Sequence, residues 1–158
     1  MTTIHPGRFT AQLTEPVVLF LIGTRINGVA ALPRVMWFIR SMPAMLKELS
    51  ARPDSGLLWY RTHLSWPYIT VQQYWKSFDH LLAYASDKSQ THFPSWGRYM
   101  REEMKKGDVG IWHETYLIEP GKFECVYGNM PVFGLAAAGQ HVPAEGRLAG
   151  AKDRLAAM

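Results

Sequence analysis

The chain has 158 residues, 47% of them hydrophobic and 19% charged, which is enough for one domain with its own core. Its net charge of +4 is scattered along the chain, and because nucleic-acid binding requires clustered positive charge, we expect no nucleic-acid partner. Cys125 is the only cysteine, which excludes an internal disulfide and a cysteine-based zinc site and fits a reducing cytoplasm.

The N-terminal part predicts an arm followed by a strand. Residues 1–14 are polar, and we expect them to be irregular. Val17–Ile26 is rich in β-branched and aromatic residues, which predicts a strand ending at the turn signal Asn27-Gly28. The apolar run Pro16–Ile22 is too short to span a bilayer and lacks a signal-peptide pattern, so we expect a cytoplasmic protein with no membrane partner.

A helix and a hairpin follow. Leu32–Ala51 carries apolar residues in steps of three and four, which predicts a helix. Pro43 interrupts this pattern, so we expect either a kink or two consecutive helices. Leu57–Leu64 and Tyr68–Trp75 predict two strands of a β-hairpin.

The second half predicts two helices and two strands. Phe78–Ala85 forms a short helix for which Ser77 is the expected N-cap, and 94–105 forms another helix. Val109–Ile118 and Lys122–Tyr127 are the last two strands. The remaining residues have many Gly, Ala and Pro residues and few aromatic ones, and we expect a tail.

We therefore divide the chain into an arm (1–14), a domain (15–131) and a C-terminal tail (132–158). The order of strands and helices matches a ferredoxin-like split βαβ unit, so the predicted fold class is α+β. Helices cover only one face of such a sheet, yet its strands are apolar on both faces. A second copy should cover the other face, which predicts a homodimeric α+β barrel.

The last long strand carries two polar residues whose side chains point to opposite faces, His113 and Glu114. A buried polar group without a partner is costly. His113 is therefore a core residue hydrogen-bonded to a neighbour, an axial haem ligand, or a general acid or base in a dry pocket. Glu114 fits a structural salt bridge, with Arg25 as one possible mate; Arg25 is alternatively an anchor for an anionic substrate.

His63 shares a strand face with Trp59 and Arg61. These three side chains either line the same cavity as His113, forming the distal side of a haem, or lie on a solvated face. Asn129 either orients a substrate oxygen or caps a turn. The motifs of hydrolytic triads, zinc hydrolases and dinucleotide-binding enzymes are absent, which disfavours those reactions.

The segment Gln73–Ala85 resembles the strand-into-helix segment of the antibiotic-biosynthesis monooxygenase superfamily of dimeric α+β barrels. Three further segments, Phe20–Asn27, Met42–Leu46 and Gly110–Tyr116, resemble a monooxygenase-like branch of unknown function. The resemblance covers about residues 15–135 and implies the fold. Relatives in this superfamily include cofactor-free oxygenases, haem-degrading proteins, and haem enzymes such as chlorite dismutases and aldoxime dehydratases, and fold alone does not decide among these activities.

The resemblance leads us to expect an oxygenase-like enzyme that binds a small hydrophobic or aromatic metabolite in an apolar barrel cavity. In the first interpretation no cofactor is required: His113 removes a proton, Arg25, Tyr116 or Asn129 holds the oxyanion, and dioxygen reacts with the substrate anion. In the second, haem b is bound with His113 on the iron. In the third, the protein is a non-catalytic module that binds a small molecule. The expected pocket residues are Trp59, Arg61, His63, Trp75, Trp112 and Tyr127.

Overall fold

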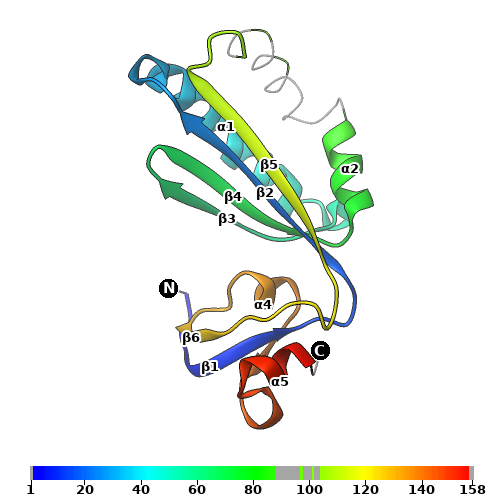
Figure 1. Ribbon diagram of the computed structural model, residues 1–158. Helices are drawn as coiled ribbons and strands as arrows, with labels where there is room; N and C mark the ends of the chain where they lie inside the picture. Colours follow the sequence, from blue (N-terminus) through cyan, green and yellow to red (C-terminus); the bar gives the residue numbers. More distant parts are fainter. Residues whose placement is uncertain (1, 88–96, 98–100, 102–103, 157–158) are drawn as a thin grey trace.

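The computed structural model describes residues 2–87, 97, 101 and 104–156, which form two antiparallel sheets (Figure 1). The larger sheet has the order β3 (Leu57–Ser65), β4 (Tyr68–Trp75), β2 (Val17–Ile26) and β5 (Val109–Ile118). The smaller sheet has the order β6 (Tyr127–Met130), β1 (His5–Gln12) and β7 (Gln140–Pro143). The larger sheet has the strand order of a ferredoxin-like split βαβ unit, which confirms the predicted α+β class.

Two helices, α1 (Leu32–Ser50) and α2 (Phe78–Ser86), pack on one face of the larger sheet (Figure 1). Helix α1 continues through Pro43, so the expected alternative of two separate helices is wrong. Residues on both sides of Pro43 bury apolar side chains against the sheet, and this packing offsets the missing N–H group. Helix α2 begins as predicted, because the Ser77 Oγ accepts a hydrogen bond from the backbone N–H of His80. The helix expected at 94–105 lies mostly outside the described residues.

Two apolar clusters hold these helices to the sheet. One contains Val18, Leu49, Trp75 and Leu81, and the other contains Ile26, Ala31, Val35 and Val109. Each cluster joins alternate residues of the strands to a helix, so the clusters identify the helix-covered face of the larger sheet. We call the other face the open face.

Short 3-10 turns complete the chain path at η1 (Val29–Ala31), η2 (Pro53–Ser55) and η3 (Gly146–Leu148).

The N-terminal residues are not an irregular arm. Strand β1 pairs with both β6 and β7, and its residues Thr10 and Ala11 are fully buried. The expectation was wrong because the strands that pair with β1 come from the other end of the sequence. The sequence of β1 is short and polar, and it does not predict a strand when its pairing partners are unknown.

The C-terminal residues are folded as well, and the expected strand at Lys122–Tyr127 is instead β6, which pairs with β1. After β6 come α4 (Leu135–Ala138), β7 and α5 (Ala151–Ala156). Arg154 of α5, whose side chain is only 4% exposed, contacts the Glu124 carboxylate at 2.6 and 2.7 Å and donates to the carbonyls of Leu148 and Ala149. The expectation of a tail was wrong because the buried Arg154 side chain bonds to Glu124, a residue in a segment distant in sequence.

The smaller sheet and α4 lie against one end of the open face (Figure 1). A third apolar cluster joins the two parts, with Ala11, Leu13, Val17, Tyr74, Leu135 and Ala136 as its buried members. The chain therefore covers part of its own open face. The rest of that face carries the side chains that are described next.

Candidate functional site

Strand register decides which side chains share a face of the larger sheet, because directly paired residues in antiparallel strands point the same way. Ile22, which follows Val18 and Phe20 on the helix-covered face, pairs with His113. Gly23, on the open face, pairs with both Trp112 and Thr70, and Thr70 pairs with His63. His113 and His63 therefore lie on opposite faces.

This placement corrects the expected grouping of His113 with Trp59, Arg61 and His63 in one cavity. His113 is exposed on the helix-covered side, with its ring centroid 5.7 Å from that of Phe20. The sequence did not decide which face its strand turns to the helices, because both faces of the strand are apolar. Of the expected pocket residues, the structure brings together Trp59, Arg61 and His63 on the open face of β3.

An unexpected residue, Phe133, lies over these three side chains. Its ring centroid is 5.0 Å from that of Trp59 and 6.5 Å from that of His63. The guanidinium carbon of Arg61 lies over the Phe133 ring, 5.4 Å from its centroid. The backbone turns directly after Phe133 at Gly134, whose φ of 58° favours glycine. Phe133 was missed because it falls in the segment that the sequence predicts to be a tail.

Two further polar residues of the open face are linked to His63 by hydrogen bonds: Gln72 contacts it directly, and Tyr74 is bonded to Gln72. The Nε2 atom of His63 lies 3.2 Å from the Oε1 of Gln72, and the Nε2 of Gln72 donates to the Oη of Tyr74 at 3.2 Å. Burial raises the pKa of Tyr74, an effect that the hydrogen bond from Gln72 partly opposes. Tyr74 is therefore a neutral phenol at physiological pH. Both residues follow the alternation of β4, but no motif marks them in the sequence.

Tyr127 completes the aromatic side of this site. Its ring centroid lies 6.4 Å from that of Phe133. Burial, followed by the nearby Cys125, raises the pKa of Tyr127 well above its ordinary value, so this phenol is also neutral. The predicted pocket residue Tyr127 thus joins Trp59, Arg61 and His63 around Phe133.

The other two expected pocket residues lie elsewhere. Trp75 is fully buried on the helix-covered face, where its Nε1 donates to the Oε1 of Gln73 at 2.9 Å, so it is a core residue. Trp112 lies on the open face against Gly23, at which a Cβ would come within 2.8 Å of the indole Nε1. That Nε1 is buried and has no hydrogen-bond partner among the described residues.

The remaining expected catalytic residues already have protein partners. Tyr116 donates a 2.6 Å hydrogen bond to Glu114 on the open face, and this bond raises the pKa of its phenol. Arg25 donates to the Oη of Tyr68 at 3.2 Å and also to Asn27. The expected mates Arg25 and Glu114 are therefore each bonded to other residues.

Asn129 has a structural role in this structure. It has a φ of 52°, and its side-chain Oδ1 accepts a hydrogen bond of 3.0 Å from the backbone N–H of Gly7. Of the two roles expected for it, this contact favours the turn cap over the orientation of a substrate oxygen. The bond joins β6 to the N-terminal strand.

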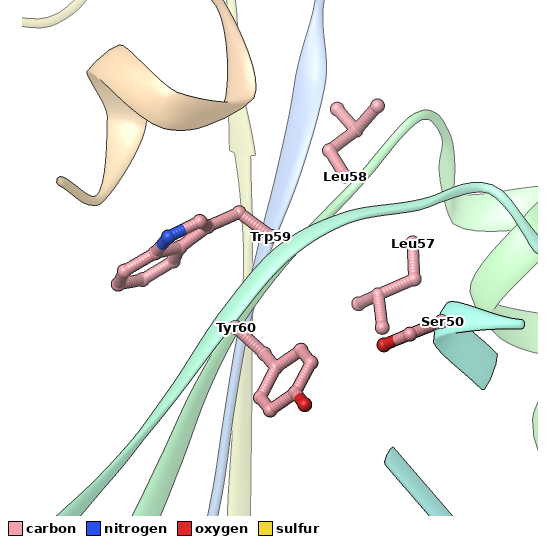
Figure 2. A pocket seen from close by; sticks show the side chains of 5 residues that line it. All are labelled: Ser50, Leu57, Leu58, Trp59 and Tyr60. Atoms are coloured by element: carbon pink, nitrogen blue, oxygen red, sulfur yellow. The ribbon is translucent and has the colours of Figure 1, made fainter. Parts of the chain in front are cut away.

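A shallow hollow of about 280 Å³ lies at the edge of the larger sheet, on strand β3 (Figure 2). Figure 2 shows Trp59 and Tyr60 leaving the strand in opposite directions, with Tyr60, Leu57 and the Ser50 hydroxyl around the hollow. The hydroxyl already donates to the carbonyl of Leu46 at 2.8 Å. The side chains that line the hollow include no charged residue and no histidine, so the open face is the better candidate site.

The described residues contain no group of three or more His, Cys, Asp or Glu side chains placed to hold a metal ion. No helix in the described part of the chain is both long and apolar enough to cross a membrane.

The fold and the face lined by Arg61, His63 and the aromatic residues define a ferredoxin-like α+β protein with an added three-stranded sheet. The chain belongs to the Monooxygenase af470-like family, whose model matches residues 17–135. This membership confirms the resemblance to a monooxygenase-like branch. A comparison with curated proteins gives no significant match.

Several solved structures are similar to parts of the chain. A conserved protein of unknown function from Bacteroides thetaiotaomicron, described as a possible oxidoreductase, has 14% identity and a TM-score of 0.45 over 66% of this chain and 100% of its own. SnoaB, a cofactor-independent oxygenase from Streptomyces nogalater, has 11% identity and a TM-score of 0.44 over 65% of this chain and 92% of its own. An aldoxime dehydratase has 13% identity and a TM-score of 0.48 over 87% of this chain and 44% of its own. These likenesses say nothing about the activity of this chain.

Proposed function

We propose that the protein is an oxygenase-like enzyme acting on a small aromatic or hydrophobic metabolite that carries an ionisable group. The proposed site is the open face beside Phe133. One observation carries this proposal: a cation, Arg61, and an imidazole, His63, converge on the same aromatic ring. Membership of a monooxygenase-like family supports the general kind of reaction.

In this mechanism His63 is the general base. Imidazole is suited to accept a proton near neutral pH, and His63 is half-buried beside aromatic side chains, where water competes less for a bound substrate. Arg61 forms no ion pair with a described acidic residue, so its charge is available to stabilise the substrate anion. Trp59 and Phe133 supply the apolar contact for a ring.

Dioxygen is the second substrate. The carbanion formed at an activated CH₂ group transfers electrons to dioxygen, a carbon–oxygen bond forms, and the peroxide then loses water. The balance is R₂CH₂ + O₂ → R₂C=O + H₂O, in which the carbon is oxidised and dioxygen is reduced. The proton taken by His63 leaves in the water. The substrate supplies its own reducing electrons, and the residues of the site bind it and move the proton.

A second copy of the chain is the proposed cover for the rest of the open face. That part carries the exposed Tyr116 and the Trp112 indole, whose buried Nε1 has no partner among the described residues. Pairing two open faces would enclose the site and form the homodimeric α+β barrel expected from the sequence.

Oxygen uptake by the purified protein tests the proposed activity. With a panel of activated phenols and aryl ketones, we expect substrate-dependent oxygen consumption and transfer of one atom from ¹⁸O₂ to the product. His63→Gln should lower kcat at least 100-fold, as is typical for removal of a general base. Loss of turnover in His113→Gln with full activity in His63→Gln would move the site to the helix-covered face.

Haem b on His113 is the second candidate. A metal-bound histidine ordinarily donates its other N–H to a nearby acceptor, but the His113 ring makes no hydrogen bond to a described residue. The described surroundings of His113 do not fit an axial ligand on this criterion. The absorption spectrum of freshly purified protein tests this candidate: a Soret band that disappears in His113→Ala would establish haem and replace the cofactor-free mechanism.

A further inference from the structure

Three polar side chains form a hydrogen-bonded chain on the open face. It runs from the Nε2 of His63 to the Oε1 of Gln72 and from the Nε2 of Gln72 to the Oη of Tyr74, with both distances 3.2 Å. Gln72 and Tyr74 lie on the open face of β4, and His63 faces the same way from β3. Gln72 is therefore the only one of the three that contacts both of the others.

The bonding rules of an amide set the direction of this chain. The NH₂ of Gln72 can only donate, and its carbonyl oxygen can only accept. With the NH₂ on the Tyr74 oxygen, the carbonyl oxygen must accept a hydrogen bond from His63, so the Nε2 of His63 carries the hydrogen. In a neutral imidazole the other nitrogen, Nδ1, then has a free lone pair.

We infer that Gln72 is a positioning residue that holds His63 in the Nε2–H tautomer. In this tautomer Nδ1, which makes no hydrogen bond to a described residue, is the atom that accepts the substrate proton. The role of Nδ1 as the base rests on the proposed function, whereas the assignment of the tautomer does not. Tyr74 is the acceptor of the Gln72 NH₂ in this orientation of the amide, with its Oη 3.2 Å from the Gln72 Nε2.

The reverse orientation of the amide is the physical alternative. If the Gln72 carbonyl faced Tyr74, the phenol would donate to it, and the NH₂ would donate to the Nε2 of His63. His63 would then carry its proton on Nδ1 and could not use that atom as a base. The two arrangements predict opposite tautomers, which makes the inference measurable.

Long-range ¹⁵N–¹H spectra of histidine-labelled protein at pH 8 provide the test, with His63→Gln assigning the signals. In the unmodified protein we expect the His63 proton on Nε2 and slow exchange of that proton with water. Gln72→Met should speed the exchange at least tenfold, and Gln72→Glu should keep the proton protected because a carboxylate oxygen also accepts it. Thr70→Val is the matched control, since Thr70 pairs with His63 across the strands but its side chain makes no hydrogen bond to a described residue, and it should leave the spectrum unchanged.

A proton on Nδ1 in the unmodified protein, or unchanged exchange in Gln72→Met, would overturn the inference. Kinetics then test the role of Nδ1 as the base: Gln72→Met should lower kcat about tenfold with little change in KM, and Gln72→Glu should restore most of the loss. A protected Nε2 proton together with full turnover in His63→Gln would leave the tautomer standing and overturn the proposed function. The spectra thus test the tautomer of His63 whether or not a substrate has been found.

Discussion

Because Gly23 has no side chain, the indole of Trp112 can pack directly against its backbone on the open face. Its strand partner is Trp112, and a Cβ at Gly23 would come within 2.7 Å of the carbonyl oxygen of Ile69 and within 2.8 Å of the indole Nε1. The backbone oxygen cannot move out of the way without disturbing the pairing of β2 with β4. The indole thus occupies the space that any other residue at position 23 would fill.

Gly23→Ala should therefore destabilise the protein by about 1–3 kcal/mol, the usual cost of inserting a methyl group into a packed region. Gly128→Ala is the matched control, because a Cβ there meets no atom within 4 Å. Urea unfolding of both variants measures the difference. Equal stability of the two variants would mean that Trp112 can leave its place over Gly23 at no cost.

An ion pair with one buried partner ties the last helix to the rest of the chain. Arg154 and Glu124 join α5 to the segment that precedes β6, and the arginine side chain is almost completely buried. By contrast, the ion pair between Lys122 and Glu119 is largely exposed. The two pairs allow a comparison of a buried cation with an exposed one.

We expect Arg154→Met to lower the free energy of unfolding by about 1–3 kcal/mol, because it removes the hydrogen bonds of the buried guanidinium to two carbonyls and its contact with Glu124. Lys122→Met should change it by less than about 0.5 kcal/mol. Chemical denaturation followed by circular dichroism gives both values. Similar losses in the two variants would contradict the structural role assigned to Arg154.

A cluster of rings lies on the smaller sheet, where His141 of β7 stacks on Phe9 at 4.3 Å and lies 4.9 Å from His5. Burial, followed by the nearby His5, lowers the pKa of His141 below 6.5. The unfolded chain therefore binds a proton more readily at this site than the folded one. Stability from this residue is fully present above pH 6.5 and is lost as the pH falls through the lower, folded pKa.

Accordingly, the melting temperature should decrease between pH 7.5 and pH 5. His141→Phe keeps a ring that can stack on Phe9 and should reduce the slope of that decrease. Calorimetric melting curves at a series of pH values, at constant ionic strength, make the comparison. An unchanged slope in the variant would assign the acid sensitivity to other groups.

Sequence patterns predicted those elements whose signal is local. Val17–Ile26 and Val109–Ile118 have strand-forming residues throughout, and Ser77 caps its helix as expected. Strand β1 was missed because both of its partners lie more than 100 residues away. The face occupied by His113 was not predictable from a strand with apolar residues on both sides, and Phe133 joined the site only through the folding of the supposed tail.

The whole molecule combines a ferredoxin-like sheet covered by helices on one side with a partly covered open face on the other. The smaller sheet and α4 cover one end of that face. Leu21, at the centre of the face, pairs with Gln72 and Glu114 and remains half-buried. An apolar residue in this position is well placed for contact with a second copy.

The dimer proposed above can be tested at this position. Light scattering should give the mass of a dimer for the unmodified protein and of a monomer for Leu21→Asp, because a charge there would be buried without a partner. Leu117→Asp is the control, since Leu117 is 69% exposed on the opposite face of the sheet. A monomeric unmodified protein would show that the open face is solvated or covered in another way.

Phe133 lies in the connection between β6 and α4, and β6 pairs with the N-terminal strand β1. A molecule that binds against this ring therefore stabilises the smaller sheet against local unfolding. Saturation should slow hydrogen exchange at the amides of β1, although no residue of β1 belongs to the site. Protection of the N-terminal strand would in this way report occupancy on the open face, and ligands could be screened by it before any reaction is known.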